Sequence, residues 1–130
     1  MSSFLELTPC ARIVLENVFL RKSYPAEGSV NAVIDTGYEG FVCVPDSIFE
    51  KLELDKLQYE KRKIALADGT VSIARGFRAS VRIPHLSMKL DGFVETFPGL
   101  DEIVIGTEAL SRMRVTLDYC TRRVRMERCP

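Results

Sequence analysis

Short strand-like runs, with little room between them for helices, constrain the fold of this chain more than any other feature. The apolar stretches are brief, rich in β-branched residues and closed by Gly, Pro or Asp-Gly. No long βαβ crossover, of the kind that joins parallel strands, fits between them. The sequence therefore predicts an all-β fold, a closed antiparallel barrel or sandwich. The expected strands are residues 4–7, 12–20, 30–34, 41–44, 61–67, 71–83, 86–90, 93–97, 103–106, 115–119 and 123–126.

Two short helices and two tight turns complete this pattern. Apolar residues return at helical spacing after Pro45, which predicts a helix near residues 46–53. A second helix is expected near residues 108–113, with Thr107 placed to cap it. Asp-Gly pairs between alternating segments predict hairpin turns, because both residue types tolerate positive φ. These pairs are Asp68-Gly69 and Asp91-Gly92.

Length and charge restrict the organisation and the partners. A chain of 130 residues is expected to form a single domain, residues 1–130. Lys plus Arg and Asp plus Glu both total 18, so no nucleic-acid partner is predicted. Six arginines in the last 20 residues are interpreted as exposed strand and turn positions rather than a polyanion site. No apolar segment is long enough to span a membrane and no secretory signal is apparent, so we expect a cytoplasmic protein.

Cysteine and histidine usage excludes several chemistries. The four cysteines show no Cys-x-x-Cys spacing, and His85 is the only histidine. A zinc site needs three or four convergent nitrogen or sulfur ligands, so we predict neither a metal nor a cofactor. His85 has no nucleophile motif nearby, which argues against Ser-His-Asp or Cys-His catalysis. We expect reduced cysteines, with a disulfide involving Cys120 or Cys129 as the alternative.

The central motif is an apolar run, residues 30–34, that ends in Asp35-Thr36-Gly37. Burying an ionised carboxylate among Val and Ile is costly unless a partner or a proton neutralises it. A glycine two residues later permits a sharp turn and lets its amide approach the carboxylate. A strand that delivers one acid to a partly dry place is suited to general acid–base chemistry. The bland alternative is a strand-ending turn, since Asp and Gly are common turn residues.

Three elements in order resemble the retropepsin-like aspartic peptidases, in particular small prokaryotic members with an aromatic residue after the triplet. The first is residues 33–37, the second is the hairpin of residues 66–71, and the third is residues 103–106 followed by a short helix. The resemblance spans about residues 14–119. It implies that Asp35 is catalytic and that one chain supplies half of the site. Two carboxyl groups must share a proton across a bound water, so the active unit is expected to be a homodimer.

The resemblance also assigns supporting roles. Thr36 is expected to hydrogen-bond across the dimer axis, and the Gly37 amide to support Asp35. The hairpin tip, formed by Ala67, Asp68, Gly69 and Thr70, is the expected flap over an extended peptide substrate. Ile105 and Gly106 are expected to form the cleft floor.

The chain departs from the retroviral members of this family at three positions. Tyr38 and Glu39 follow the triplet where those members have a small residue and an Asp, and Thr107 replaces an Arg. The Arg–Asp pair that braces the retroviral dimer is therefore absent in that form. We consider Arg112 or Arg114 as alternative partners for Glu39.

Two functions from different classes remain open at this stage. The first is an aspartic endopeptidase that hydrolyses extended polypeptide as a homodimer. The second is a non-catalytic peptide-binding or dimerisation module that retains the fold. An all-β structural subunit of a larger assembly is a third, weaker interpretation.

Overall fold

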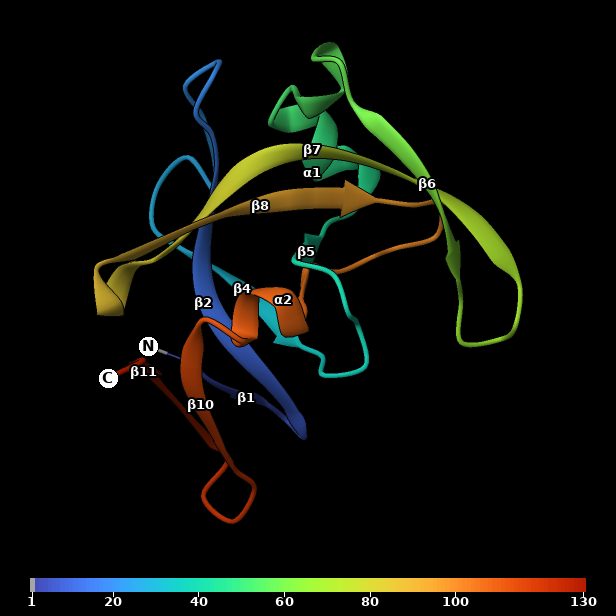
Figure 1. Cartoon of the computed structure of the whole chain (residues 1–130). Helices are drawn as coiled ribbons and strands as arrows, with labels where there is room; N and C mark the ends of the chain where they lie inside the picture. The colour runs from blue at the N-terminus through green and yellow to red at the C-terminus, as the bar shows by residue number, and fades with distance from the viewer. Residues whose placement is uncertain (1) are drawn as a thin grey trace.

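The computed structural model describes residues 2–130, which form an 11-stranded mixed sheet with four short helical segments (Figure 1). The strands are β1 Ser3–Leu5, β2 Thr8–Asn17, β3 Lys22–Tyr24, β4 Val30–Ile34, β5 Val42–Cys43, β6 Glu60–Ala65, β7 Val71–Ile83, β8 Met88–Thr96, β9 Val104–Ile105, β10 Met113–Asp118 and β11 Arg123–Arg128. The helices are α1 Asp46–Lys51 and α2 Thr107–Leu110, with 3₁₀ turns η1 Leu54–Lys56 and η2 Pro84–Leu86.

Six of these strands close a ring of hydrogen bonds. The order is β2-β4-β9-β5-β8-β7, and β7 returns to β2, where Leu15 pairs with Val81. Branched and aromatic side chains fill the interior, and β2 is buried along almost its whole length because it lies inside the sheet with neighbours on both sides. The most buried include Ile13, Leu15, Phe41, Val42, Val44, Phe49, Val81, Val94 and Ile105. The prediction of a closed all-β fold is confirmed.

The sheet is mostly antiparallel, as predicted, but it also contains two parallel pairs that the sequence did not indicate. β4 pairs with β9 in parallel, and β5 pairs with β8 in parallel. Both connections are far longer than a single βαβ unit: other strands of the sheet lie between the paired ones in sequence. The absence of crossover helices excluded local parallel units, but it did not exclude parallel pairs between distant segments.

The Asp91-Gly92 turn predicted from sequence is not formed. Both residues lie inside β8, where Asp91 pairs with Ser80 and Gly92 pairs with Ala79. A Cβ on Gly92 would lie 2.5 Å from Cγ of Phe41, so this glycine makes room for a buried ring. The chain reverses earlier, at η2 and at Ser87, whose φ of 48° is left-handed.

The β6–β7 hairpin is formed as predicted and projects from the ring (Figure 1). Its tip is residues 66–70, where the Gly69 amide donates to the Leu66 carbonyl at 3.0 Å. Gly69 has a φ of +85°, whereas Asp68 does not have positive φ. The turn is therefore longer than a two-residue Asp-Gly turn, and only its glycine needs the left-handed conformation.

Both predicted helices are present and slightly shorter than expected. α1 buries Ile48 and Phe49 against the ring and begins directly after Pro45. α2 begins after Gly106, so Thr107 is its first residue rather than its cap. The Thr107 hydroxyl instead donates to the Tyr38 carbonyl at 3.3 Å, because the loop after β4 lies against this end of the helix.

Candidate functional site

The candidate site begins where β4 leaves the ring. The Val33 amide donates to the Ile103 carbonyl at 2.8 Å, and the Asp35 amide donates to the Ile105 carbonyl at 3.1 Å. The parallel pairing with β9 thus continues one residue past the end of β4. It fixes the backbone of Asp35 before the chain turns away.

The Asp35 carboxylate is held by the turn that follows it. The Gly37 amide donates to Oδ1 of Asp35 at 2.8 Å, and the Tyr38 amide donates to the Asp35 carbonyl at 3.2 Å. A Cβ on Gly37 would lie 3.1 Å from the same Oδ1, a tight contact. Asp35, Thr36 and Gly37 are all exposed. The partly dry surroundings expected for Asp35 are therefore not provided by residues 2–130 of a single chain.

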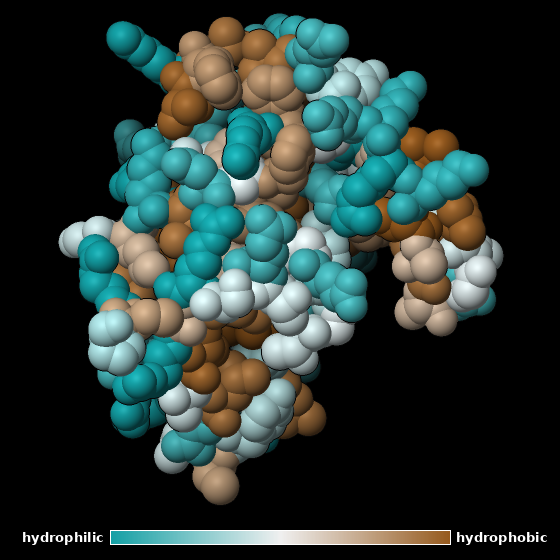
Figure 2. All heavy atoms as spheres, viewed as in Figure 1, coloured by the Kyte–Doolittle hydropathy of each residue, from teal (hydrophilic) through white to brown (hydrophobic). Residues whose placement is uncertain are grey.

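The four predicted flap residues lie together at the exposed tip of the β6–β7 hairpin. Asp68 organises this tip: its Oδ1 accepts from the Thr70 amide at 2.9 Å and from the Thr70 hydroxyl at 2.6 Å. These hydrogen bonds, the one from the hydroxyl foremost, hold the pKa of Asp68 below its usual range. Figure 2 shows the hairpin as a separate projection with open space between its tip and the body.

The two predicted floor residues contribute backbone rather than exposed side chains. Ile105 and Gly106 are buried, and the Ile105 carbonyl is the group that contacts Asp35. The Gly106 amide donates to the Phe41 carbonyl at 2.9 Å. A Cβ on Gly106 would lie 2.5 Å from Cδ2 of Tyr38. These residues form the support beneath the loop that carries Asp35.

No protein-family model matches the chain. An uncharacterized protein of Archaeoglobus fulgidus is 48% identical over 126 residues, which cover 97% of this chain and 98% of that protein. The chain belongs to the same family as this archaeal protein. A crystal structure of a retropepsin-like aspartic protease from Rickettsia conorii has a TM-score of 0.63 and 17% identity, over 94% of this chain and 92% of that chain. The fold is thus retropepsin-like, as the sequence resemblance predicted.

A polar cluster beside the loop that carries Asp35 was not predicted from the sequence. The Tyr38 hydroxyl donates to Oε1 of Glu95 at 2.8 Å, and Arg62 donates to the same carboxylate through Nη2 at 2.6 Å and through Nε. Glu95 is 6% exposed. The signal in the sequence was an acid inside the apolar strand of residues 93–97, which requires a partner once buried.

Burial dominates the electrostatics of this cluster. It raises the pKa of the Tyr38 phenol, with the neighbouring Cys43 and Glu95 adding to the effect. It also raises the pKa of the Cys43 thiol to about 12, with the Glu95 charge contributing. Both groups are therefore neutral near pH 7.

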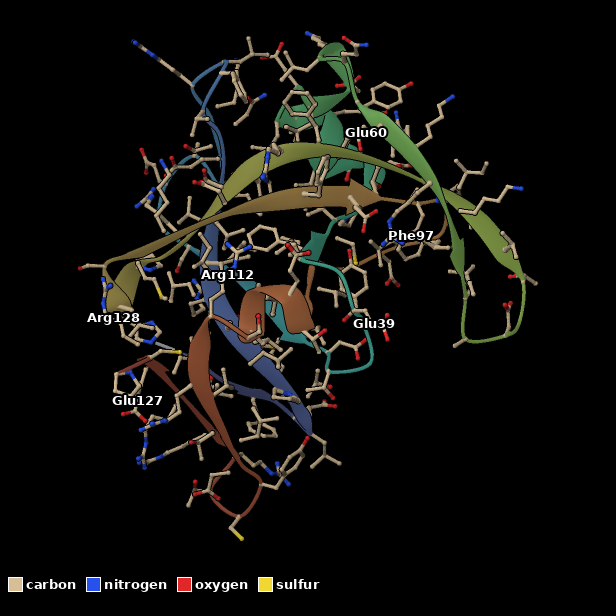
Figure 3. All side chains as sticks on the ribbon, in the orientation of Figure 1. Glu39, Glu60, Phe97, Arg112, Glu127 and Arg128 are labelled. Carbon is tan, nitrogen blue, oxygen red and sulfur yellow. The ribbon has the colours of Figure 1, made fainter. Side chains whose placement is uncertain are left out.

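Arg112, one of the two partners considered for Glu39, does not pair with it. Arg112 instead donates to the Asp91 carbonyl at 2.7 Å and reaches Glu108 at 3.5 Å, and its guanidinium lies over the Phe41 ring. Arg112 and Glu39 lie on opposite sides of α2 (Figure 3). Among residues 2–130 no ion pair forms between Glu39 and Arg114 either.

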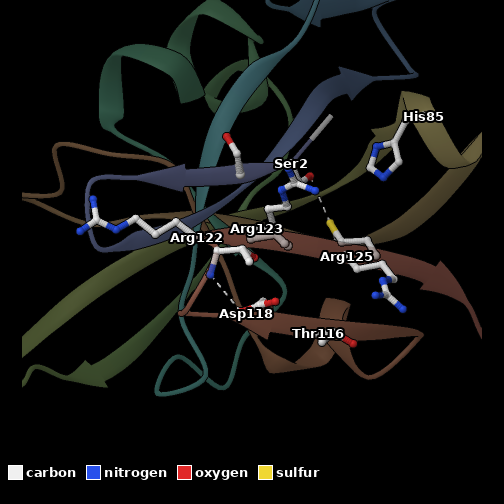
Figure 4. Close-up of a pocket in the computed structure, with 11 residues that line it drawn as sticks. Ser2, His85, Thr116, Asp118, Arg122, Arg123 and Arg125 are labelled. Atoms are coloured by element: carbon white, nitrogen blue, oxygen red, sulfur yellow. Dashed lines mark hydrogen bonds between the residues drawn. The ribbon is translucent and has the colours of Figure 1, made fainter.

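Elsewhere in residues 2–130, the structure holds a pocket lined partly by charged side chains but no cluster of metal-ligating residues. In the part of the chain that the structure describes, no group of three His, Cys, Asp or Glu residues is arranged to hold a metal ion. A pocket of about 790 Å³ lies over β11, away from Asp35, and is bordered by His85, Asp118 and three arginines (Figure 4). Those arginines, Arg122, Arg123 and Arg125, are exposed turn and strand residues, as predicted. Between residues 2 and 130 no helix is both long and apolar enough to cross a membrane.

Proposed function

We propose that this protein is an aspartic endopeptidase that acts as a homodimer on extended polypeptide. The observation that carries the proposal is the presentation of Asp35. Its backbone is fixed by Ile105 and its carboxylate by the Gly37 amide, on an exposed loop of a retropepsin-like fold. A carboxylate that is held in place yet open on one side is suited to meet a second carboxyl group and a water.

The chemistry needs two copies of Asp35. Two carboxyl groups at close range share one proton, because like charges cannot both ionise there. The ionised Asp35 takes a proton from the bound water, which attacks the peptide carbonyl. The protonated Asp35 of the other copy hydrogen-bonds the carbonyl oxygen and then protonates the leaving nitrogen. The Thr36 hydroxyl is proposed to hydrogen-bond across the two-fold axis beneath this pair.

An exposed apolar edge supports association of two copies near Asp35. Cys10 pairs with Val33, so the register places the β1–β2 turn at the level of Asp35. Leu5 and Leu7 in this segment are 54% and 68% exposed. Exposed apolar side chains at one edge favour burial against a partner, and two-fold pairing is the commonest form of self-association.

The projecting hairpin is the second observation in favour of the proposal, because it is suited to bind a substrate in an extended conformation. Val71 and Ile73, two residues apart on β7, share one face of the strand and are 66% and 51% exposed. β6 is an edge strand, which leaves main-chain groups unpaired on one side. A hairpin with an open edge and exposed apolar side chains can cover a peptide and exclude water from the acids.

Four free cysteines support a reducing compartment, and we propose the cytoplasm.

The decisive experiment compares Asp35→Asn with the unmodified protein and with Asp101→Asn, which changes an exposed loop acid. Cleavage of an unfolded protein substrate is measured from about pH 3 to pH 7, the range in which a shared-proton carboxyl pair works. Asp35→Asn should lower kcat by about 10³-fold or more, whereas Asp101→Asn should not. Undiminished cleavage by Asp35→Asn refutes the proposal. Tight peptide binding without turnover by the unmodified protein favours the non-catalytic module.

A further inference from the structure

Glu95 stands at the junction of three segments that are far apart in sequence. It lies on β8, it accepts from Tyr38 of the catalytic loop, and it accepts from Arg62 of the hairpin arm β6. The Glu95 side chain is almost fully buried, whereas that of Arg62 is 52% exposed. One carboxylate thus connects the loop that carries Asp35 to the arm that carries the flap.

The contact between Arg62 and Glu95 crosses an intervening strand. Among the strands described in residues 2–130, β6 pairs only with β7, and β7 in turn pairs with β8. Gly76 of β7 pairs with Glu95, and a Cβ on this glycine would lie 3.2 Å from Cγ of Glu95. The missing side chain leaves space over β7 for the Arg62 guanidinium to reach the carboxylate. The ion pair therefore braces the edge strand in addition to its backbone ladder.

The Tyr38 side chain is packed tightly enough that a movement of Glu95 would also displace Tyr38. A Cβ on Gly40 or on Gly106 would overlap the Tyr38 ring, so the ring packs directly against two backbones. The Thr107 amide donates to the Tyr38 carbonyl at 2.8 Å. The Tyr38 amide donates in turn to the Asp35 carbonyl. A shift of the phenol would therefore be felt by the turn that carries Asp35.

We propose that Glu95 is a positioning residue that couples the flap arm to the catalytic loop through Arg62 and Tyr38. The inference rests on the proposed function for its effect on catalysis. The coupling itself is a property of the fold. It is expected because a buried carboxylate that loses one of its two donors must recruit water or move.

Hydrogen exchange tests the coupling without reference to activity. Arg62→Gln removes the brace from the exposed end and keeps the buried carboxylate. Amides of β6 and of residues 66–70 should exchange at least threefold faster, with β2 and β4 unchanged. Arg82→Gln is the matched control, because it removes another cross-strand ion pair, to Glu16, away from the arm. Equal exchange at the arm in Arg62→Gln and the unmodified protein overturns the coupling.

Steady-state kinetics distinguish residues that act on the flap arm, and so on KM, from residues that act on the loop with Asp35, and so on kcat. Arg62→Gln should raise KM about fivefold or more with kcat within twofold, since the flap arm closes on substrate. Tyr38→Phe should lower kcat at least fivefold with KM within twofold, since Tyr38 adjoins the acid. Glu95→Gln should do both. The same change in kcat and KM from all three substitutions would indicate general destabilisation and overturn the positioning role.

The two proposals fail in distinguishable ways. If the protein has no peptidase activity, Asp35→Asn is silent but faster exchange at the flap arm in Arg62→Gln still supports the network. If cleavage depends on Asp35 but arm exchange is unchanged, the proposed function stands and the coupling is wrong. Should Glu95→Gln fail to fold, Arg62→Gln alone decides, because it alters an exposed side chain.

Discussion

Cys43 is buried beside Tyr38 and Glu95, next to the loop that carries Asp35, and the raised pKa of its thiol keeps it protonated. Only the thiolate is nucleophilic, so a thiol with its pKa at about 12 stays unreactive at pH 8. Cys10 is likewise buried with a raised pKa, chiefly because of burial, whereas Cys120 and Cys129 are exposed. The four free cysteines therefore form two groups, one buried and unreactive and the other exposed and open to reagents.

Thiol titration of the native protein checks this division. A coloured disulfide reagent at pH 8 should modify Cys120 and Cys129 within minutes and leave Cys10 and Cys43 unmodified. Raising the pH towards 12 should accelerate modification of Cys43, because the thiolate form gains population as pH approaches the pKa. All four cysteines should react after unfolding in denaturant. Rapid modification of all four in the native protein would contradict the buried environment.

Asp35 and Glu95 show which contacts of the candidate site could be predicted from the sequence and which could not. The Gly37 amide was expected beside Asp35 and is there, because that contact is local and follows from the turn. The Glu95 partners were not foreseen, because Arg62 and Tyr38 lie 33 and 57 residues away in sequence. Such contacts depend on strand order, which residue spacing does not encode.

Strand β8 shows how tertiary packing overrides a local turn signal. Asp91-Gly92 has the composition of a hairpin turn, yet it pairs along β7 in continuous register. The glycine is needed because the Phe41 ring occupies the place of its side chain. The β6–β7 hairpin was predicted correctly because no buried ring competes for Gly69, around which a Cβ would meet nothing within 4 Å.

A double-mutant cycle at this contact tests the packing explanation. Gly92→Ala should destabilise the fold by about 1–3 kcal/mol through overpacking, measured by urea denaturation. Phe41→Ala alone should also destabilise, because it leaves a cavity. The double variant should be no less stable than Phe41→Ala, since alanine lacks the Cγ and Cδ atoms that the new methyl group would meet. Strictly additive losses would show that Gly92 is needed for another reason.

Considered as a whole, the molecule carries balanced charge and an exposed apolar edge. Lys plus Arg equal Asp plus Glu at 18 each, so repulsion between two copies is small. The β10–β11 turn adjoins the same edge, because the Tyr119 ring packs edge-on against Phe4 of β1 with centroids 4.9 Å apart. Tyr119 is 59% exposed. Leu5, Leu7 and Tyr119 together offer the surface on which the proposed dimer depends.

A charge placed on this edge should separate the two copies. Leu7→Glu is expected to raise the dimer dissociation constant at least tenfold, because burying an unpaired carboxylate is unfavourable. Sedimentation velocity across a concentration series measures it. Val18→Glu is the control, since Val18 is an exposed apolar residue beyond the opposite end of β2. A dimer that is unaffected by Leu7→Glu but lost in Val18→Glu would place the interface at the other end of the molecule.

The two-residue strand β9 also determines when the ring of strands can close while the chain is being synthesised. It lies between β4 and β5, both of which leave the ribosome about 60 or more residues earlier. Until residues 104 and 105 emerge, β4 and β5 lack the partner that joins them, and the ring cannot close. Asp35 therefore acquires its backbone support only when four-fifths of the chain exists. A nascent chain released before that point holds the acid but not the scaffold that aims it.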